Sequence, residues 1–331
     1  MNNAASTAAL AGVSTLRVGL GCMGMSEFYG PADDEANLRA LHTAFALGYR
    51  HFDTADMYGR GANEQLLARF VGELGARRAE VLLATKVGIE RLADGNIAAN
   101  SRADYIQAAC EASLRRLGVE RIGLLYLHRK TPEVPIEETV GAMARLVEQG
   151  KVGALGLSEV SAATLERACK TAPIAALQSE YSLWSRDVEA AVLPMCRAHG
   201  VKLVAYSPLG RGFLTGAVSP ATLAEGDLRR RLPRFQEDNF RANEALLAVV
   251  QGIAQALGCS TAQVALAWLL GKGDDVHAIP GSRREANMAA NIAALGIRLS
   301  PIARRELDAA FAGGAVHGLR YPEALLKTVN V

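Results

Sequence analysis

The segment GYRHFDTADMYGRGANEQLLARF, residues 48–70, decides the fold of this chain. A short apolar run at its start is followed at once by a helical pattern, which is typical of a strand that leads into a helix. A strand this apolar is buried on both faces, as in a parallel sheet covered by helices. It nevertheless ends in Asp53, Asp56 and Tyr58, and two acids and a phenol at the end of a buried strand indicate a site rather than core packing.

The same unit, a short apolar run followed by a helical pattern, recurs along the whole chain. The eight runs are residues 18–23, 51–55, 81–87, 122–129, 153–159, 175–182, 201–209 and 276–282. Eight units of about 25 to 40 residues predict a closed (β/α)₈ TIM barrel, with residues 1–331 forming a single domain. A doubly wound open sheet is the structural alternative, and length alone is compatible with one large domain or two ordinary ones.

Several segments depart from the regular spacing. Residues 210–240 stretch the seventh unit with glycine, proline and charge, and a loop this long in a compact domain is usually functional, so we expect it to cover the cofactor or active site. Residues 1–15 are predicted to be a flexible N-terminus. The segment from about Leu299 onward is expected to lie against the outside of the barrel or to close over one end. Ser101 is predicted to cap a helix over 102–118.

Charge and cysteine usage narrow the classes of partner. The 331 residues carry 36 basic and 34 acidic side chains, a net charge of +2, which argues against a nucleic-acid groove and an anionic membrane surface. The five cysteines form no CxxC pair, and the histidines are not spaced as metal ligands. No apolar window approaches the length of a membrane span or signal peptide. We expect a soluble cytoplasmic protein that binds small, uncharged metabolites and no metal.

In a barrel the site forms at the carboxyl ends of the strands, so the polar residues there are the candidates. They are Asp53, Tyr58, Lys86, His128, Arg129, Lys130, Ser158, Glu159, Gln178, Glu180, Tyr206 and Ser207. An apolar core would not tolerate these groups unpaired. The sequence therefore predicts that they line a binding or catalytic site.

Four of these residues indicate carbonyl chemistry. Lys86 and Asp53 end adjacent strands and could form a partly buried ion pair. A phenol beside that ammonium would have its pKa lowered from about 10, which would make Tyr58 a proton donor near neutral pH. His128, on the next strand, could hydrogen-bond the substrate oxygen. An acid, a polarising cation and an orienting imidazole together fit the reduction of a carbonyl.

Other interpretations of these residues stay open. Lys86 alone could be a Schiff-base lysine, although pairing with Asp53 would keep it charged. Tyr58 alone could be a solvated loop tyrosine, and His128 a core histidine. Residues 19–24, GLGCMG, fit a dinucleotide fingerprint, but no helix opens directly after them, so we predict no Rossmann unit.

Six motifs, in the order FDTADMYG, LLATKVG, LLYLHR, GALGLSE, LQSEYSLW and AYSPLGRGFLTG, resemble the signatures of the aldo-keto reductase superfamily. More narrowly, the chain resembles the bacterial and plant branch of pyridoxal-reductase-like and auxin-induced-protein-like members. The resemblance covers residues 16 to 297. It implies a (β/α)₈ barrel and NADPH-dependent reduction of aldehydes and ketones to alcohols, or the reverse oxidation.

The resemblance also implies roles for particular residues. It matches Asp53, Tyr58, Lys86 and His128 to the family's catalytic tetrad, with Tyr58 giving the proton as the nicotinamide gives the hydride. The positions matched to NADP(H) contacts are Gly21, Cys22, Met23, Asp53, Ser158, Gln178, Tyr206, Ser207, Pro208, Leu209, Gly210, Arg211, Gly281, Ser282, Arg283, Asn287 and Asn291. Many relatives carry Arg or Gln at the position of Asn287 and Glu at that of Ala290, while Arg283 and Arg284 keep guanidinium groups that suit a phosphate.

The wall of the substrate pocket is predicted from aromatic and cationic residues near strand ends. Candidates are Phe28, Tyr29, Arg129 and Trp184, with Phe213 and Phe235 on the long loop, and packing within the loops is the alternative for each. The partner would be a small carbonyl compound, and the protein a monomer or a weak homo-oligomer. A cofactor-binding regulatory subunit on the same barrel, with little turnover, is the alternative function.

Overall fold

The structure is a computed structural model that describes residues 17–26, 28–30, 32–92 and 96–329. The predicted flexible N-terminus at 1–15 lies outside these residues. Within them, eight parallel strands form one sheet in the order β1 (Leu20–Gly21), β2 (His51–Asp53), β3 (Leu82–Val87), β6 (Ile122–Leu127), β7 (Val152–Ser158), β8 (Ala176–Glu180), β9 (Lys202–Tyr206) and β10 (Val276–Ala278). A parallel bridge between Val18 and Ala278 joins the two ends of the sheet. The predicted (β/α)₈ barrel is confirmed, and the open doubly wound sheet is not formed.

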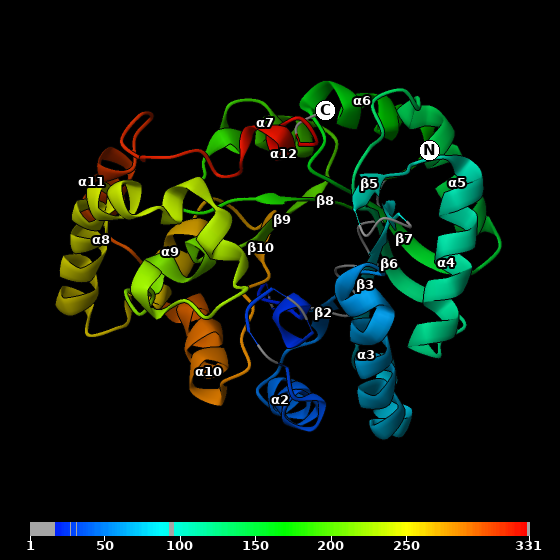
Figure 1. The fold of residues 1–331 in the computed structure, drawn as a ribbon, viewed down its shortest axis with the longest axis horizontal. Coiled ribbons are helices and arrows are strands. Elements are labelled where there is room, and N and C mark those ends of the chain that lie inside the picture. Colours follow the sequence, from blue (N-terminus) through cyan, green and yellow to red (C-terminus); the bar gives the residue numbers. More distant parts are fainter. Residues whose placement is uncertain (1–16, 27, 31, 93–95, 330–331) are drawn as a thin grey trace.

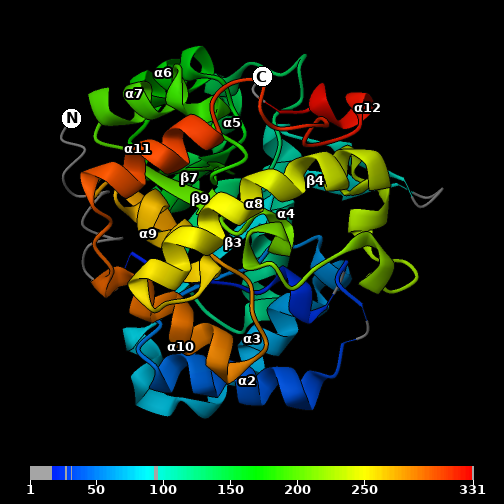
Figure 2. The ribbon, with the colours of Figure 1, turned by 90° about the vertical axis from the view of Figure 1, so that its left-hand side faces the viewer.

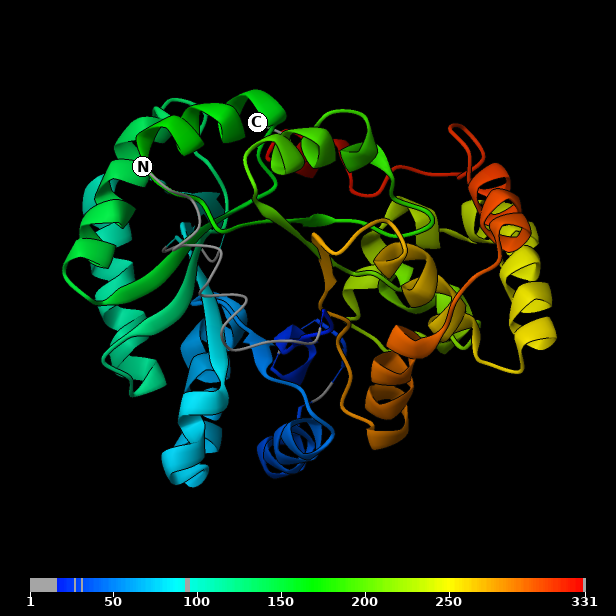
Figure 3. The same ribbon diagram turned by 180° about the vertical axis from the view of Figure 1, so that it is seen from behind.

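Helices surround the curled sheet (Figure 1, and from behind Figure 3). They are α2 (Asp34–Ala46), α3 (Ala62–Glu73), α4 (Ala103–Leu117), α5 (Ile136–Glu148), α6 (Ala162–Thr171), α7 (Val192–Ala198), α8 (Glu237–Leu257), α9 (Thr261–Leu270), α10 (Glu285–Ala293), α11 (Pro301–Ala310) and α12 (Glu323–Leu326). The largest apolar cluster fills the space between these helices and the outer face of the sheet. Among the described residues no single helix is long and apolar enough to span a membrane, although α8 and α9, bent by 94° at their junction, pass that test as a pair.

Alternation along the strands decides which side chains enter the barrel. In β3, Leu82 and Ala84 belong to a small inner apolar cluster, whereas Leu83 and Val87 belong to the outer one. Side chains two residues apart share a face, so the next inward position on β3 is Lys86. The inner cluster forms a floor, and polar groups follow it at the carboxyl ends of the strands.

The details differ from the expectations in three places. Ser101 does not cap α4, whose N-cap is Arg102; its hydroxyl instead accepts a hydrogen bond from the backbone N–H of Thr131, 3.0 Å away. A two-stranded antiparallel hairpin, β4 (Ile89–Arg91) and β5 (Ile97–Ala99), was not predicted. The long loop after β9 ends at Glu237, where α8 begins, and contains four short 3₁₀ turns.

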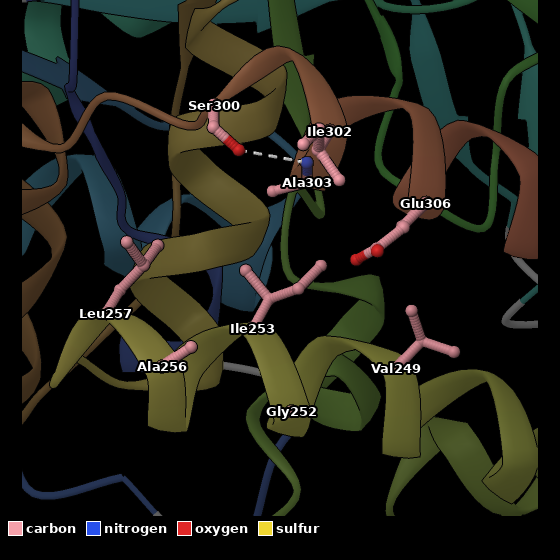
Figure 4. A pocket seen from close by; sticks show the side chains of 9 residues that line it. All are labelled: Val249, Gly252, Ile253, Ala256, Leu257, Ser300, Ile302, Ala303 and Glu306. Carbon is pink, nitrogen blue, oxygen red and sulfur yellow. Dashed lines mark hydrogen bonds between the residues drawn. The ribbon is translucent and has the colours of Figure 1, made fainter.

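The C-terminal part of the chain begins with a helix docked on the outside. Helix α11 packs beside α8, as Figure 2 shows, and Ser300 caps it by accepting a hydrogen bond from the N–H of Ala303 at 3.1 Å. Figure 4 shows the apolar groove of about 410 Å³ between the two helices, with Ile302 and Ala303 facing Ile253. This packing confirms the expectation that the segment after the eighth helix lies against the barrel.

Candidate active site

The polar layer above the apolar floor is assembled by the same alternation on each strand. Inward positions are Asp53 on β2, Lys86 on β3, Ser158 on β7, Gln178 on β8 and Tyr206 on β9, and His128 follows β6. The sheet is parallel and closed, so these ends meet at one mouth. The sequence predicted all six, because each is a polar residue at the carboxyl end of a predicted strand.

Lys86 is the centre of the site. Its ammonium forms a hydrogen-bonded ion pair with the carboxylate of Asp53, with side chains only 2% and 4% exposed. It also donates to the carbonyl oxygen of Thr54 at 2.8 Å and to the hydroxyl oxygen of Tyr58 at 3.3 Å. These three contacts satisfy the three N–H groups of the ammonium. A buried cation whose N–H groups all have hydrogen-bond partners, and which lies beside a phenol, is suited to stabilise a phenolate.

The chain after β2 is held so that Tyr58 reaches this ammonium. The backbone N–H groups of Thr54 and Asp56 donate to the carbonyls of Ala84 and Lys86, at 2.8 and 3.0 Å, so the pairing with β3 continues beyond the strand. Gly61 then turns the chain at a φ of 90°, where a Cβ atom would also lie 2.5 Å from Cδ of Arg116. The turn places the Tyr58 side chain over the mouth, 8% exposed.

The pKa of Tyr58 differs from the sequence-based prediction. Burial raises the pKa of the phenol, and the opposing effect of Lys86 does not overcome it, so the net shift is upward. The pKa of Lys86 is also raised, because Asp53 and Tyr58 outweigh the burial that would lower it. The predicted lowering of the phenol pKa was wrong for the protein without ligands: the sequence shows the cation but not the depth of burial. Tyr58 is therefore a neutral phenol and Lys86 a cation at neutral pH.

His128 stands edge-on to Tyr58, with ring centroids 5.9 Å apart. Burial, followed by the charges of Arg129 and Lys86, holds the pKa of His128 well below its usual range. Its Nδ1 atom is buried without a hydrogen-bond partner. A neutral imidazole carries one N–H donor, so His128 can offer a hydrogen bond without adding a charge.

Residues behind the tetrad hold it in place, and sequence reasoning missed some of them. Gln178 was predicted, and its Nε2 donates to the second carboxylate oxygen of Asp53 at 2.8 Å. Thr54 and Asn63 were missed: the Thr54 hydroxyl donates to Asn63 Oδ1 at 2.6 Å, and Asn63 Nδ2 donates to the carbonyl of Cys22 at 2.9 Å. Thr54 directly follows Asp53 in the quoted segment, which is the available sequence signal.

The second acid of the quoted segment takes no part in the tetrad. Burial, and next the charge of Glu64, raise the pKa of Asp56 to about 7. Glu64 itself is fully buried and accepts hydrogen bonds from Thr85 and Arg116, each at 2.6 Å. Asp56 lies outside the lining of the cavity at the mouth. Of the two acids, only Asp53 lines this cavity.

A single cavity of about 860 Å³ connects the tetrad to the ends of β9 and β10. Its volume is in the range of small-molecule sites, about 300–1,000 Å³. Predicted residues that line it are Gly21, Met23, Phe28, Tyr29, Asp53, Tyr58, His128, Arg129, Ser158, Gln178, Tyr206, Ser207, Pro208, Leu209, Arg211, Gly281, Ser282, Arg283, Asn287 and Asn291. Lys86 lies directly behind this lining, against Asp53 and Tyr58.

Besides Lys86, the predicted residues that lie outside the lining are Cys22, Lys130, Glu159, Glu180, Gly210, Trp184, Phe213 and Phe235. The side chain of Cys22 is fully buried, with its thiol 3.6 Å from the carbonyl of Leu20. Gly210, at a φ of 56°, faces Trp184, whose Nε1 would lie 2.7 Å from an added Cβ. Trp184 itself stacks on Phe213 with ring centroids 4.2 Å apart.

Trp184, Phe213 and Phe235 therefore do not form the predicted pocket wall. They are 3%, 0% and 2% exposed and pack against one another beneath the long loop. Apolar burial is the physical reason, since three large rings gain more by packing together than by facing an open cavity. These aromatic residues anchor the loop, which agrees with the alternative prediction that they pack within the loops.

Other residues that sequence reasoning missed also line the cavity. The hairpin contributes Ile89, Ile97, Ala98 and Ala99 near Tyr58. The C-terminal segment contributes Tyr321, Leu325, Thr328 and Val329. Neither segment carried a motif. Within the described residues, no group of three or more His, Cys, Asp or Glu side chains is arranged to hold a metal ion.

Comparisons with known proteins agree with this arrangement. A model of the Aldo/keto reductase family matches residues 17–311. The chain is 44% identical over 310 residues to the NADP(+) aldo-keto reductase yakc of Schizosaccharomyces pombe, covering 92% of this chain and 91% of the relative. The structure of glycerol dehydrogenase AKR11B4 from Gluconobacter oxydans superposes with a TM-score of 0.82 at 29% identity, covering 92% and 93% of the two chains. An aldo-keto reductase from Klebsiella pneumoniae in complex with NADPH gives 0.71 at 27% identity, covering 92% and 94%.

Proposed function

The chain belongs to the aldo/keto reductase family and is an NADP-dependent oxidoreductase, and from this premise we propose that it reduces aldehydes or ketones to alcohols with Tyr58 as the proton donor. The observation that carries the proposal is the Tyr58 hydroxyl, which lines the cavity and lies 3.3 Å from a buried ammonium. A neutral phenol can give its proton to a carbonyl oxygen, and Lys86 stabilises the phenolate that remains.

The residues around the cavity fit the two ends of NADP(H). The side-chain amide of Gln178 donates an N–H to Asp53. Its carbonyl oxygen can therefore accept a hydrogen bond from the N–H of a carboxamide. Ser158 accepts a hydrogen bond from Arg129 at 3.0 Å and keeps its own hydroxyl hydrogen to donate. At the other end, Arg283 and Arg284 line the cavity with guanidinium groups. When bound, the nicotinamide would supply the hydride.

The chain's own groups would then direct the reaction. His128, which is neutral, would donate a hydrogen bond to the substrate oxygen. Tyr58 would release its proton to the same oxygen, and the Asp53 carboxylate would keep Lys86 charged throughout. Beside Tyr58, Met23, Met57 and Ile89 offer an apolar surface to the rest of the substrate. The site therefore favours carbonyl compounds with an apolar or aromatic body.

The experiment that tests this function is a titration of NADPH fluorescence with the purified protein, followed by the loss of the nicotinamide absorbance with pyridoxal, methylglyoxal and 4-nitrobenzaldehyde. We expect saturable binding and oxidation of NADPH with at least one of the three. Binding without turnover on this panel and on further carbonyls would favour a regulatory subunit on the same barrel.

Replacing Arg283 by alanine is expected to weaken NADPH binding by roughly 10- to 100-fold and NADH binding far less, because one hydrogen bond to a charged group contributes about 1.5–3 kcal/mol. Only NADPH carries the 2′-phosphate that a guanidinium would bind. Fluorescence titration with both cofactors measures the ratio. Arg298→Ala, at an exposed position outside the cavity, is the matched control. Equal weakening of both cofactors would show that the 2′-phosphate is bound elsewhere.

A further inference from the structure

The C-terminal segment after α11 returns to the mouth of the barrel. It is fastened on the way, because Asn243 of α8 exchanges two hydrogen bonds with the backbone of His317, at 3.0 and 2.9 Å, and Arg234 donates to the carbonyl of Gly318 at 3.1 Å. Figure 2 shows α12 at the same end of the molecule as the β4–β5 hairpin. The family match ends at residue 311, so this segment lies beyond the residues that the family model matches.

Arg320 closes this segment onto the end of β7. Its guanidinium donates to both carboxylate oxygens of Glu159, at 3.0 and 2.7 Å, with side chains 10% and 3% exposed. Burial raises the pKa of Glu159, but the charge and hydrogen bonds of Arg320, together with the Arg129 charge and the Glu180 N–H, outweigh it, so the net shift is downward. Glu159 has a φ of 56°, a conformation that persists only where the surroundings hold it. Its neighbour Ser158 is the proposed carboxamide contact.

Tyr321 completes a hydrogen-bond chain whose direction is fixed. The Tyr206 hydroxyl lies 2.8 Å from a Glu159 oxygen and must donate, because a carboxylate only accepts. Tyr321, 3.0 Å away, must therefore donate to Tyr206. Arg211 in turn donates to the Tyr321 hydroxyl at 2.7 Å and to Glu180 at 2.9 Å. This series of hydrogen bonds runs from the loop after β9, through the C-terminal segment, to the end of β7.

The two barrel groups that Tyr321 joins are those proposed to contact NADP(H). Tyr206, at the end of β9, and Arg211, in the loop after it, both line the cavity. Arg211 also has a positive φ of 55°. The ring of Tyr321 lies under the Arg211 guanidinium, 5.0 Å from its centroid. The C-terminal segment thus fixes both side chains and forms a wall of the same cavity.

We propose that Arg320 and Tyr321 are cofactor-positioning residues, which latch the C-terminal segment over bound NADP(H) and set the rate at which it leaves. The latch consists of the Arg320–Glu159 ion pair and the chain from Arg211 through Tyr321 to Tyr206. Because Tyr321, Leu325, Thr328 and Val329 line the cavity, opening these contacts would free the cofactor to leave. The inference rests on the cofactor placement proposed above.

The test is the rate of NADPH release, measured by stopped-flow fluorescence when the preformed complex is mixed with excess NADP⁺. We expect Arg320→Met and Tyr321→Phe each to speed release by about tenfold, as the loss of a charged or networked hydrogen bond implies. Arg320→Lys keeps the charge but cannot make the paired hydrogen bonds of the guanidinium to Glu159. Its rate of NADPH release should therefore lie between those of Arg320→Met and the unaltered protein. Arg305→Met, an exposed charge on α11 outside the cavity, should leave release unchanged.

A melting curve of each variant without cofactor separates positioning from folding. Tyr321→Phe keeps the ring and removes only the hydroxyl, so it should melt close to the unaltered protein and still release NADPH faster. Unchanged release in both Arg320→Met and Tyr321→Phe would overturn the latch. The assay uses no carbonyl substrate, so it does not depend on the role of Tyr58. If Arg283→Ala weakens NADPH while the latch variants release it normally, the latch fails and the cofactor placement stands.

Discussion

Tyr58→Phe is expected to lower the rate of carbonyl reduction by roughly a hundredfold to ten-thousandfold, the range that general acid catalysis supplies. The variant keeps the ring that faces His128 and removes the hydroxyl that Lys86 contacts. NADPH affinity should change little, because the phenol serves proton transfer and is not among the proposed contacts of the cofactor. The loss should therefore fall on kcat, with the cofactor dissociation constant preserved.

Two measurements decide this prediction. Steady-state turnover with the best carbonyl of the panel gives kcat, and NADPH fluorescence gives affinity. Tyr181→Phe is the control, because its hydroxyl bonds to Glu189, outside the cavity lining. Turnover of the Tyr58 variant within about threefold of the unaltered enzyme would refute Tyr58 as the acid.

The pH dependence follows from the same group. The acid form is the neutral phenol, and burial raises its pKa above the ordinary value, so Tyr58 stays protonated through the neutral range. The reductive rate should be level to about pH 8 and should fall only as pH rises toward the phenol pKa. Tyr58→Phe should lose that alkaline limb. An alkaline fall that persists in the variant would have to come from another group.

The barrel and its polar layer could be predicted because they follow from local periodicity. Short apolar runs give strands, and alternation turns Lys86 and Gln178 into the same mouth as Asp53. Ordered motifs could then match these positions to a family. This information lies within single strands, so no knowledge of tertiary packing was needed.

The remaining features depend on contacts between segments far apart in the chain. Trp184 was predicted to line the pocket because its place near a strand end can be read from the sequence. Its stacking partner Phe213 cannot be read in the same way. The upward pKa shift of Tyr58 arises from burial, which no local pattern gives. Arg320 and Tyr321 carry no motif, and their partner Glu159 lies 161 residues away in the sequence from Arg320. Desolvation and long-range pairing are properties of the folded chain.

Lys86→Met is expected to abolish reduction and also to destabilise the fold by about 3–5 kcal/mol, the effect of removing one partner of a buried ion pair. The Asp53 carboxylate would keep the hydrogen bond from Gln178 but lose its charge partner, at a depth where its side chain is 4% exposed. The double variant Asp53→Asn/Lys86→Met removes both charges and should recover much of the stability in urea denaturation. It should recover no activity, since Tyr58 would still lack its cation. Recovery of turnover would show that Lys86 only holds the fold.

The same residue separates reduction from Schiff-base chemistry. Asp53 and Tyr58 raise the pKa of Lys86 against the effect of burial, so its amine is protonated and is a poor nucleophile at neutral pH. Borohydride added with a carbonyl substrate should therefore leave Lys86 unlabelled, as peptide mass analysis would show. Labelling at Lys86 would instead establish a covalent imine and would displace Tyr58 from the centre of the mechanism. The ion pair therefore favours the proposed proton transfer from Tyr58 over attack by the Lys86 amine.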